Sequence, residues 1–370
     1  MQLHPLWAAI GLSLVSLPLS YMLNSVSTLE NPLLIALVGF GVLLALFAVV
    51  YLPNRSEDPL FYVCMVFSFT SVIDIIIALE EDGYISGFME FYMREGEVYL
   101  TTAYGIMICY WDGTVHYALY LLIIATMAQR NDYRTLVLYW IGSFGMNLLV
   151  FLIGNVIGKY GSEIKPAAFL NAPYLLVLIW ASARIIQQPK TSTLMAADKV
   201  SEEQSKSLLQ RPLDLGLVVF LHFAVAFTLF RGLVVLDCPA DTCFDYVYQK
   251  EPYLRDPVAY PKVQMLVYLF YCLPYFCLCI YGLLSPGCTW MPDWALVFAG
   301  AIAQAQFCHI GSSLHLRTPY PYRTPEGTWW SFVLSNVAFA VGPQLLAYRC
   351  LRNPGFFSPV VSRDEGKKNQ

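Results

Sequence analysis

The sequence predicts an all-α polytopic membrane protein, and three observations support this fold class. Hydrophobic residues make up 57% of the chain and charged residues only 13%, far below the ~25% charged fraction that is usual in soluble domains. The hydrophobic residues are gathered in runs of ~20, the length at which a helix crosses the hydrocarbon core of a bilayer. The net charge of −4 is small and dispersed. Because no basic cluster is interleaved with aromatic residues, nucleic acid is excluded as an expected partner.

Ten such runs are expected to form transmembrane helices. They are residues 6–23, 33–52, 60–80, 104–128, 135–157, 167–187, 213–236, 263–285, 293–313 and 329–350. The first run could instead be a signal peptide, but residues 1–5 contain no Lys or Arg, which favours a retained helix. An even number of spans puts both termini on one side, and the loops on that side hold more basic residues. The positive-inside rule therefore predicts that both termini are cytosolic.

Two halves of the chain resemble each other, which predicts a tandem repeat of a four-helix unit. Glu97–Leu100 recurs as Glu251–Leu254, and Arg184 recurs as Arg349 with a proline at the same distance after it. Both halves start on the same side, so this is not the inverted repeat of many secondary transporters. The predicted units are two N-terminal transmembrane helices (1–57), a first bundle (58–189), a polar cytosolic linker (190–210), a second bundle (211–354) and a cytosolic tail (355–370).

The clearest functional signal is the pair Asp112 and His116 in the fourth span. An aspartate at the centre of an inserted helix costs about 2.5–3.5 kcal/mol on insertion scales, and a spacing of four puts both side chains on one helical face. Asp74 in the third span is expected at a similar depth, so the three residues are candidates for proton-handling catalysis or for ligand binding. A helix-packing contact is the alternative. Further ligand-binding candidates nearby are Ser71, Cys109, Tyr120, Asn147 and Asn155.

Two cysteines and two lysines carry predictions of another kind. Cys238 and Cys243 share one non-cytosolic loop and are expected to form a disulfide in an oxidising compartment. Lys367 and Lys368 are the fourth- and third-last residues, the pattern of a dilysine retrieval signal of the endoplasmic reticulum, although a solvated basic tail would read the same way. No phosphate-binding loop, zinc motif or serine-elbow motif occurs, so neither a metal nor a cofactor is expected.

Several strings resemble the transmembrane 6 superfamily. They are Phe69–Val72, Ile76–Glu80, Gly87–Met89, Cys109–Gly113, Gly154–Asn155, Asp237–Pro239, Glu251–Pro257 and Pro292–Val297. The resemblance implies two tandem EXPERA domains, the four-helix unit shared with the emopamil-binding sterol isomerase. In that isomerase a histidine and a glutamate on one helix and a glutamate on the next move a double bond. Asp112 is similar to the second carboxylate and Asp74 or Glu80 to the first, while the histidine is absent from that helix and His116 stands on the next.

The resemblance also implies a function. A member of this family is expected in the membranes of the endoplasmic reticulum and the ER–Golgi intermediate compartment. It would bind membrane lipid or sterol, act with lipoprotein-assembly proteins of the secretory pathway, and promote the loading of triglyceride and cholesterol into secreted lipoproteins, which changes lipid droplet content. The leading hypothesis is therefore a lipid-binding regulator. The alternatives are a sterol isomerase that uses Asp74, Asp112 and His116, and a lipid transporter or scramblase.

Overall fold

The structure is a computed structural model that describes residues 5–26, 31–53, 58–188 and 197–359. Every regular element within these ranges is helical. Ten helical segments in the described part are long and apolar enough to cross a membrane, and each coincides with one of the ten predicted spans. The predicted all-α polytopic fold is therefore confirmed.

Three helices precede the repeated part of the chain: α1 (Pro5–Leu14), α2 (Ser16–Asn24) and α3 (Pro32–Tyr51). The first predicted span is thus broken in two. Pro18 explains the break, because its ring nitrogen cannot donate a hydrogen bond to the carbonyl group one turn before it. Helices α1, α2 and α3 all pack against α4.

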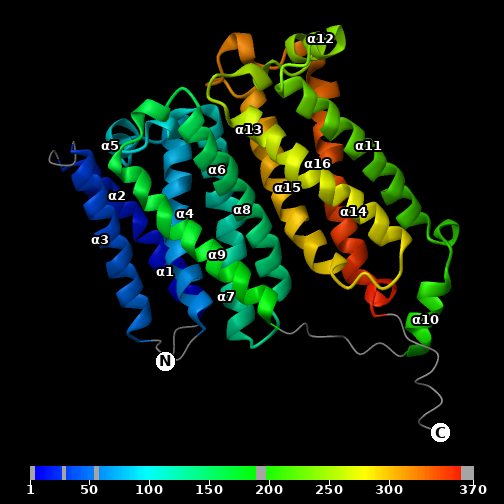
Figure 1. The fold of residues 1–370 in the computed structure, drawn as a ribbon. Helices are drawn as coiled ribbons and strands as arrows, with labels where there is room; N and C mark the ends of the chain where they lie inside the picture. The colour runs from blue at the N-terminus through cyan, green and yellow to red at the C-terminus, as the bar shows by residue number, and fades with distance from the viewer. Residues whose placement is uncertain (1–4, 27–30, 54–57, 189–196, 360–370) are drawn as a thin grey trace.

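Two bundles follow, and they lie side by side in Figure 1 with the same order of elements. The first consists of α4 (Pro59–Glu81), α6 (Ala103–Trp111) continuing into α7 (Tyr117–Ala128), α8 (Arg134–Ile157) and α9 (Ala172–Gln187). The second consists of α11 (Pro212–Val235), α13 (Tyr260–Val267) continuing into α14 (Leu273–Leu284), α15 (Met291–Leu314) and α16 (Trp329–Arg352). In both, short helices lie at the upper end of Figure 1, namely α5 (Glu90–Glu95) and α12 (Asp241–Gln249).

The second membrane helix of each bundle contains one π-helical turn, at Asp112–His116 and at Tyr268–Cys272. A π-turn replaces hydrogen bonds between residues four apart by bonds between residues five apart, and such turns are frequent at functional sites. Four residues therefore no longer complete a turn at Asp112, and this changes which way the neighbouring side chains face.

The two bundles meet along α8 and α15. Gly142 and Gly300 allow this approach, because a Cβ atom at Gly142 would lie 1.7 Å from the carbonyl oxygen of Val297, and one at Gly300 would lie 2.0 Å from that of Tyr139. Glycine at such positions lets two helix backbones come close together. The packing of the two bundles is therefore tightest where their third membrane helices run together.

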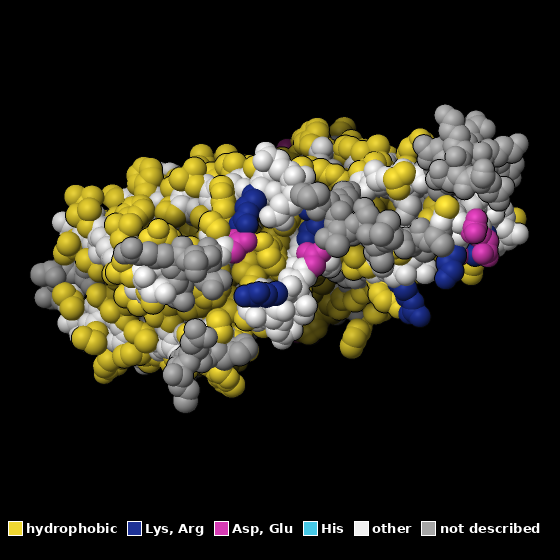
Figure 2. Space-filling model, turned by 90° about the horizontal axis from the view of Figure 1, so that it is seen from below, with side chains coloured by type: hydrophobic (Ala, Val, Ile, Leu, Met, Phe, Trp, Pro, Cys, Tyr) yellow, Lys and Arg dark blue, Asp and Glu magenta, His cyan; other side chains and the backbone are white. Residues whose placement is uncertain are grey.

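An arginine connects the last helix of each bundle to the start of its first helix. Arg184 on α9 donates a hydrogen bond of 2.6 Å to Asp58, and Arg349 on α16 donates one of 2.6 Å to Asp214. These contacts lie at the lower end of Figure 1, where α1 begins and the short helix Pro354–Phe357 ends. Figure 2 views that end and shows hydrophobic side chains around the rim, with the charged side chains gathered near the middle and at one side.

Two sequence predictions refer to this end of the molecule. The cytosolic location of the termini stays a prediction. Lys367 and Lys368 lie outside the described residues. The linker is described from residue 197 onward, where α10 (Ala197–Ser205) packs against the second bundle through Gln204, which donates a hydrogen bond of 2.9 Å to the carbonyl oxygen of Ser358.

Candidate functional site

A cavity of about 190 Å³ lies between the N-terminal helices and the first bundle. Its walls come from α2, α3, α4, α6 and α8, and from the segment that opens α9. Most of the lining is apolar, with rings such as Phe69, Phe91, Phe144 and Phe151. The volume exceeds that of the ~150 Å³ apolar cavity that admits benzene in another protein, so the cavity has room for part of an organic molecule.

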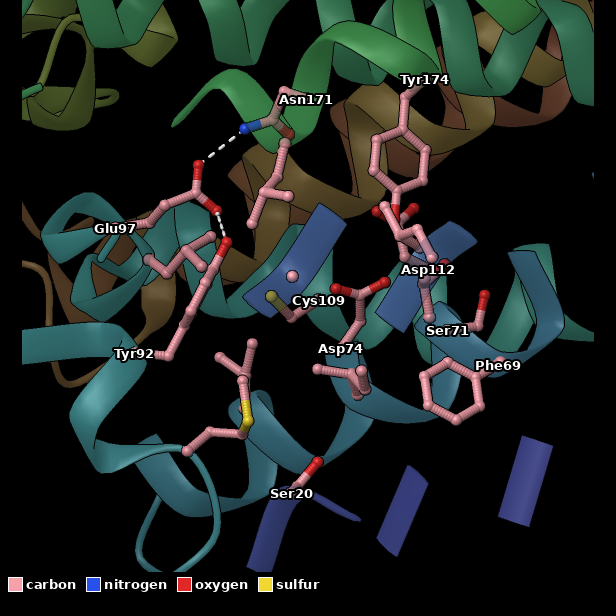
Figure 3. Close-up of a pocket in the computed structure, with 18 of the residues that line it drawn as sticks. Ser20, Phe69, Ser71, Asp74, Tyr92, Glu97, Cys109, Asp112, Asn171 and Tyr174 are labelled. Carbon is pink, nitrogen blue, oxygen red and sulfur yellow. Dashed lines mark hydrogen bonds between the residues drawn. The ribbon is translucent and has the colours of Figure 1, made fainter. Parts of the chain in front are cut away.

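Two carboxyl groups face the deep part of this cavity, Asp74 from α4 and Asp112 from the π-turn (Figure 3). Within the part of the chain that the structure describes, Asp74 makes no hydrogen bond and no ion pair. An unpartnered carboxyl group surrounded by apolar side chains is costly. Asp74 therefore presents an unused polar group to whatever enters the cavity. The predicted neighbours that also line the cavity are Ser71, Cys109, Tyr120 and Asn147.

Asp112 is held in place from two sides. Asn147 on α8 donates hydrogen bonds of 3.0 and 2.9 Å to its two oxygens, and Nδ1 of His116 lies 2.6 Å from Oδ1. His116 is fully buried and does not line the cavity. The predicted contact between Asp112 and His116 therefore exists, but only the carboxylate of Asp112 faces the cavity. His116 acts on any ligand only through Asp112.

Behind His116, a chain of hydrogen bonds fixes its ring. Trp111 Nε1 donates to Ser143 Oγ at 2.9 Å, and Ser143 Oγ lies 2.7 Å from His116 Nε2. Because an indole N–H group can only donate, the arrangement is satisfied when Ser143 donates to Nε2 and the Nδ1 proton faces Asp112. The order Ser–His–Asp resembles a hydrolase triad, but Ser143 is fully buried and lies outside the cavity. The geometry is that of an oriented carboxylate and excludes Ser143 as a nucleophile.

The upper end of the cavity contains a third carboxyl group, Glu97, which sequence reasoning did not select. Tyr92 and Asn171 donate hydrogen bonds of 2.6 Å each to it, and Tyr99 donates another (Figure 3 draws the first two). Burial raises the pKa of Glu97 above its ordinary value, against the lowering effect of these three hydrogen bonds. The cavity thus has two groups of polar side chains. One surrounds Asp74 and Asp112 in its deep part, and the other surrounds Glu97 at its upper end.

The N-terminal helices also form part of the site. Ser20 of α2 and Val38 and Val42 of α3 line the cavity, whereas sequence reasoning placed these helices outside the repeated part without a role. The signal for Glu97 was present, since Glu97–Leu100 recurs as Glu251–Leu254. For α3 no such signal exists, because a helix that is apolar all round does not indicate which face is covered.

Some predicted site residues are not brought to the cavity. Asn155 accepts a hydrogen bond from the Tyr260 hydroxyl at the contact between the bundles and does not line the cavity. Eight residues after Asn147 it has turned about 80° further round the helix. Its role in ligand binding stays a prediction. Glu80 also lies outside the cavity lining. Its carboxylate accepts hydrogen bonds of 2.8 and 2.6 Å from the backbone N–H groups of Phe88 and Met89, and these bonds hold the loop before α5 in place.

The cysteine pair lies at the upper end of the second bundle. Cys238 and Cys243 are free thiols in this structure. They are close enough to interact, since a hydrogen bond from Cys243 lowers the pKa of Cys238. The disulfide stays a prediction.

The second bundle has a polar cluster of its own, at Arg231, Glu251, His309 and Asn336. Arg231 donates to both oxygens of Glu251 at 2.6–3.0 Å and to Asn336 Oδ1 at 3.0 Å, and its Nη2 lies 2.8 Å from His309 Nε2. All four side chains are at most 2% exposed. Burial alone would raise the pKa of Glu251, but the charge of Arg231 and the hydrogen bond with His309 lower it to about 2.

Comparison with known proteins identifies the family. A family model described as "Transmembrane 6 superfamily member 2-like, transmembrane domain" matches residues 15–196, and one described as "EXPERA (EXPanded EBP superfamily)" matches residues 240–350. The first model covers α2 and α3 together with the first bundle, while α1 lies before the matched range. The second covers most of the second bundle, so an EXPERA unit is shown there.

Three relatives match almost the whole chain, all described as Transmembrane 6 superfamily member 2. The protein of Rattus norvegicus is 59% identical over 98% of this chain and 97% of its own length, and that of Mus musculus is 58% identical over the same shares. The protein of Homo sapiens is 59% identical over 96% of each chain. No solved structure matches. At this identity and coverage, the chain belongs to the transmembrane 6 superfamily, and its similarity to member 2 spans both bundles.

Proposed function

We propose that this protein binds a sterol or neutral lipid in the cavity between its N-terminal helices and its first bundle. The observation that carries the proposal is the cavity itself. Its walls are predominantly apolar, and it has two separate groups of polar side chains, one at Asp74 and Asp112 and one at Glu97. Apolar walls with a few placed polar groups are the usual composition of a small-molecule site. A lipid with one polar end fits such a site.

The position of the cavity favours a ligand that arrives from the membrane. Its walls belong to helices long and apolar enough to span a bilayer. Helix α3, which forms one wall, has many side chains exposed on its other face, such as Leu37 and Leu44. A molecule already dissolved in the bilayer meets this site without crossing water.

The wider role rests on family membership. We propose that lipid binding serves the loading of triglyceride and cholesterol into secreted lipoproteins, with an effect on lipid droplet content. It would take place in the membranes of the endoplasmic reticulum and the ER–Golgi intermediate compartment, with both termini in the cytosol and together with lipoprotein-assembly proteins.

Mass spectrometry of lipid that co-purifies with the protein tests the binding step. Val42 and Leu44 lie on the same helix, Val42 lining the cavity and Leu44 69% exposed on the outside. Val42→Trp fills the cavity and is expected to lose the bound lipid, while the matched control Leu44→Trp retains it. In cells that secrete lipoproteins, only Val42→Trp should lower the triglyceride they secrete. Equal lipid content in both variants would contradict the proposal.

Sterol isomerisation is a second candidate, favoured by one observation. Asp112 presents an oriented carboxyl group to the cavity, with His116 2.6 Å behind it, an arrangement suited to moving a proton to or from a bound sterol. Asp112→Asn keeps the size of the side chain and removes its acidity. If the protein is an isomerase, this variant abolishes sterol conversion in microsomes that lack other isomerases. Unchanged conversion would eliminate this candidate and leave lipid binding untouched.

A further inference from the structure

We propose that the second bundle contains a closed counterpart of the cavity, in which the side chain of Arg231 takes the place of a bound molecule. This site is separate from the cavity of the first bundle. The inference does not depend on which lipid, if any, that cavity holds.

The positions of the two sites correspond residue by residue on their first helices. Counted from the prolines that open α4 and α11, Asp74 corresponds to Phe227 and Ala78 to Arg231. In the first bundle, Asp74 faces the cavity and the small Ala78 follows one turn later on the same face. In the second bundle, the aromatic ring of Phe227 stands where the first bundle has the carboxyl group of Asp74. The long cationic side chain of Arg231 stands where the first bundle has the methyl group of Ala78.

The acceptors at the upper end also correspond. Glu97 and Glu251 each precede a short helical turn, and Asn171 and Asn336 stand at the same distance before the arginines Arg184 and Arg349. In both bundles the asparagine amide donates to the glutamate, at 2.6 Å in the first and 3.3 Å in the second. The second bundle has thus kept the acceptor group of the first.

Arg231 fills the space in front of this acceptor. Its guanidinium group contacts the Glu251 carboxylate and Asn336 as described above, and it lies over the ring of Phe227 at 4.6 Å from the centroid. A planar cation bonded to a carboxylate and stacked on an aromatic ring is how a guanidinium ligand would be recognised. The chain therefore supplies, as one of its own side chains, the cation that pairs with Glu251 and donates to Asn336.

Removing that side chain should leave a hole that a small guanidinium ion can enter. Arg231→Ala removes an ethylguanidinium-sized fragment and leaves Glu251 buried without its cation, so the melting temperature of the full-length protein in detergent should fall by roughly 5–15 °C. Millimolar ethylguanidinium is expected to restore at least half of this loss, with a response that saturates. If the variant does not fold alone, the same rescue is measured as the yield of monodisperse protein when ethylguanidinium is present throughout solubilisation.

Two control variants separate binding at this site from a general effect of the ion. Arg231→Ala/Glu251→Gln has no buried carboxylate to neutralise and should not respond. Arg211→Ala removes another buried arginine, but Asp214 keeps its contact with Arg349, so it should not respond either. Absence of a saturating response in Arg231→Ala, by melting temperature and by yield, would overturn the proposal, and so would an equal response in Arg211→Ala.

Discussion

The two bundles use the same buried glutamate in opposite ways. Glu97 faces a cavity and is bonded only by neutral donors, whereas Glu251 is bonded by Arg231 in a cluster that leaves it 2% exposed. A buried carboxylate without a cation tends to become neutral, while a buried pair keeps both charges. The two bundles therefore share one architecture, and the polar residues inside each bundle distinguish the open cavity of the first from the closed charged cluster of the second.

The largest expected effect comes from breaking the charged pair. Glu251→Gln leaves Arg231 buried without a counter-charge and should destabilise the protein by about 3–5 kcal/mol. Glu97→Gln removes no ion pair and should change stability by about 1 kcal/mol or less. Thermal unfolding of both variants in the same detergent measures the difference, and equal losses would mean that the two bundles are not distinguished by charge.

The pH dependence of stability should have opposite signs in the two bundles. The pKa of Glu251 is lowered from 4.5 to about 2 in the folded state, so its contribution is fully present above pH 4.5 and is lost as the pH falls toward 2, by about 3 kcal/mol in all. The pKa of Glu97 is raised, so its contribution is present below pH 4.5 and is lost as the pH rises through the folded-state value.

Melting curves between pH 3 and pH 8 test these signs by difference. The difference in melting temperature between the wild type and Glu251→Gln should become smaller as the pH falls. The melting temperature of Glu97→Gln should rise relative to that of the wild type as the pH rises. A difference in melting temperature that changes in the same direction for both variants would refute the opposite directions of the two pKa shifts.

A smaller effect is expected where the bundles meet. Gly300→Ala puts a methyl group against the backbone of Tyr139, and overpacking of this kind costs about 1–3 kcal/mol. Gly216, which has open space where a Cβ atom would stand, provides the control Gly216→Ala, which should be neutral or slightly stabilising. Thermal unfolding measures both, and a similar loss in the two would show that the close approach of α8 and α15 is not required.

The smallest effect on stability comes from making the first bundle resemble the second. Asp74→Phe gives the first bundle the phenylalanine that the second bundle has at the equivalent position, Phe227. Because the change removes an unpartnered polar group, it should stabilise the protein by about 1 kcal/mol. The same variant should lose co-purifying lipid, because the ring occupies the cavity. Destabilisation without loss of lipid would show that Asp74 has a structural partner and is not part of a ligand site.

Sequence reasoning reached the membrane-embedded acids and missed their surroundings for identifiable reasons. Asp74 and Asp112 are visible because a charged group within an apolar run is costly whatever the tertiary structure. His116 was expected in the same pocket, but the π-turn changes the spacing rule and its ring faces α8 instead. Glu97 belongs to a loop whose burial depends on how α5 folds over the helix ends. No local pattern encodes that burial, and only the recurrence of Glu97–Leu100 as Glu251–Leu254 marks the residue in the sequence.

The contact between α8 and α15 has a consequence for how such a molecule is assembled. The two helices start at the same end of the molecule, where Arg134 bonds to Asp293 at 2.8 Å, and each brings a glycine against the backbone of the other at nearly equivalent positions. The bundles are thus related by an approximate twofold axis along the membrane normal, as the two subunits of a homodimer are. With both copies in one chain, one bundle was free to carry Phe227 and Arg231 where the other has Asp74 and Ala78, without depriving the molecule of its cavity.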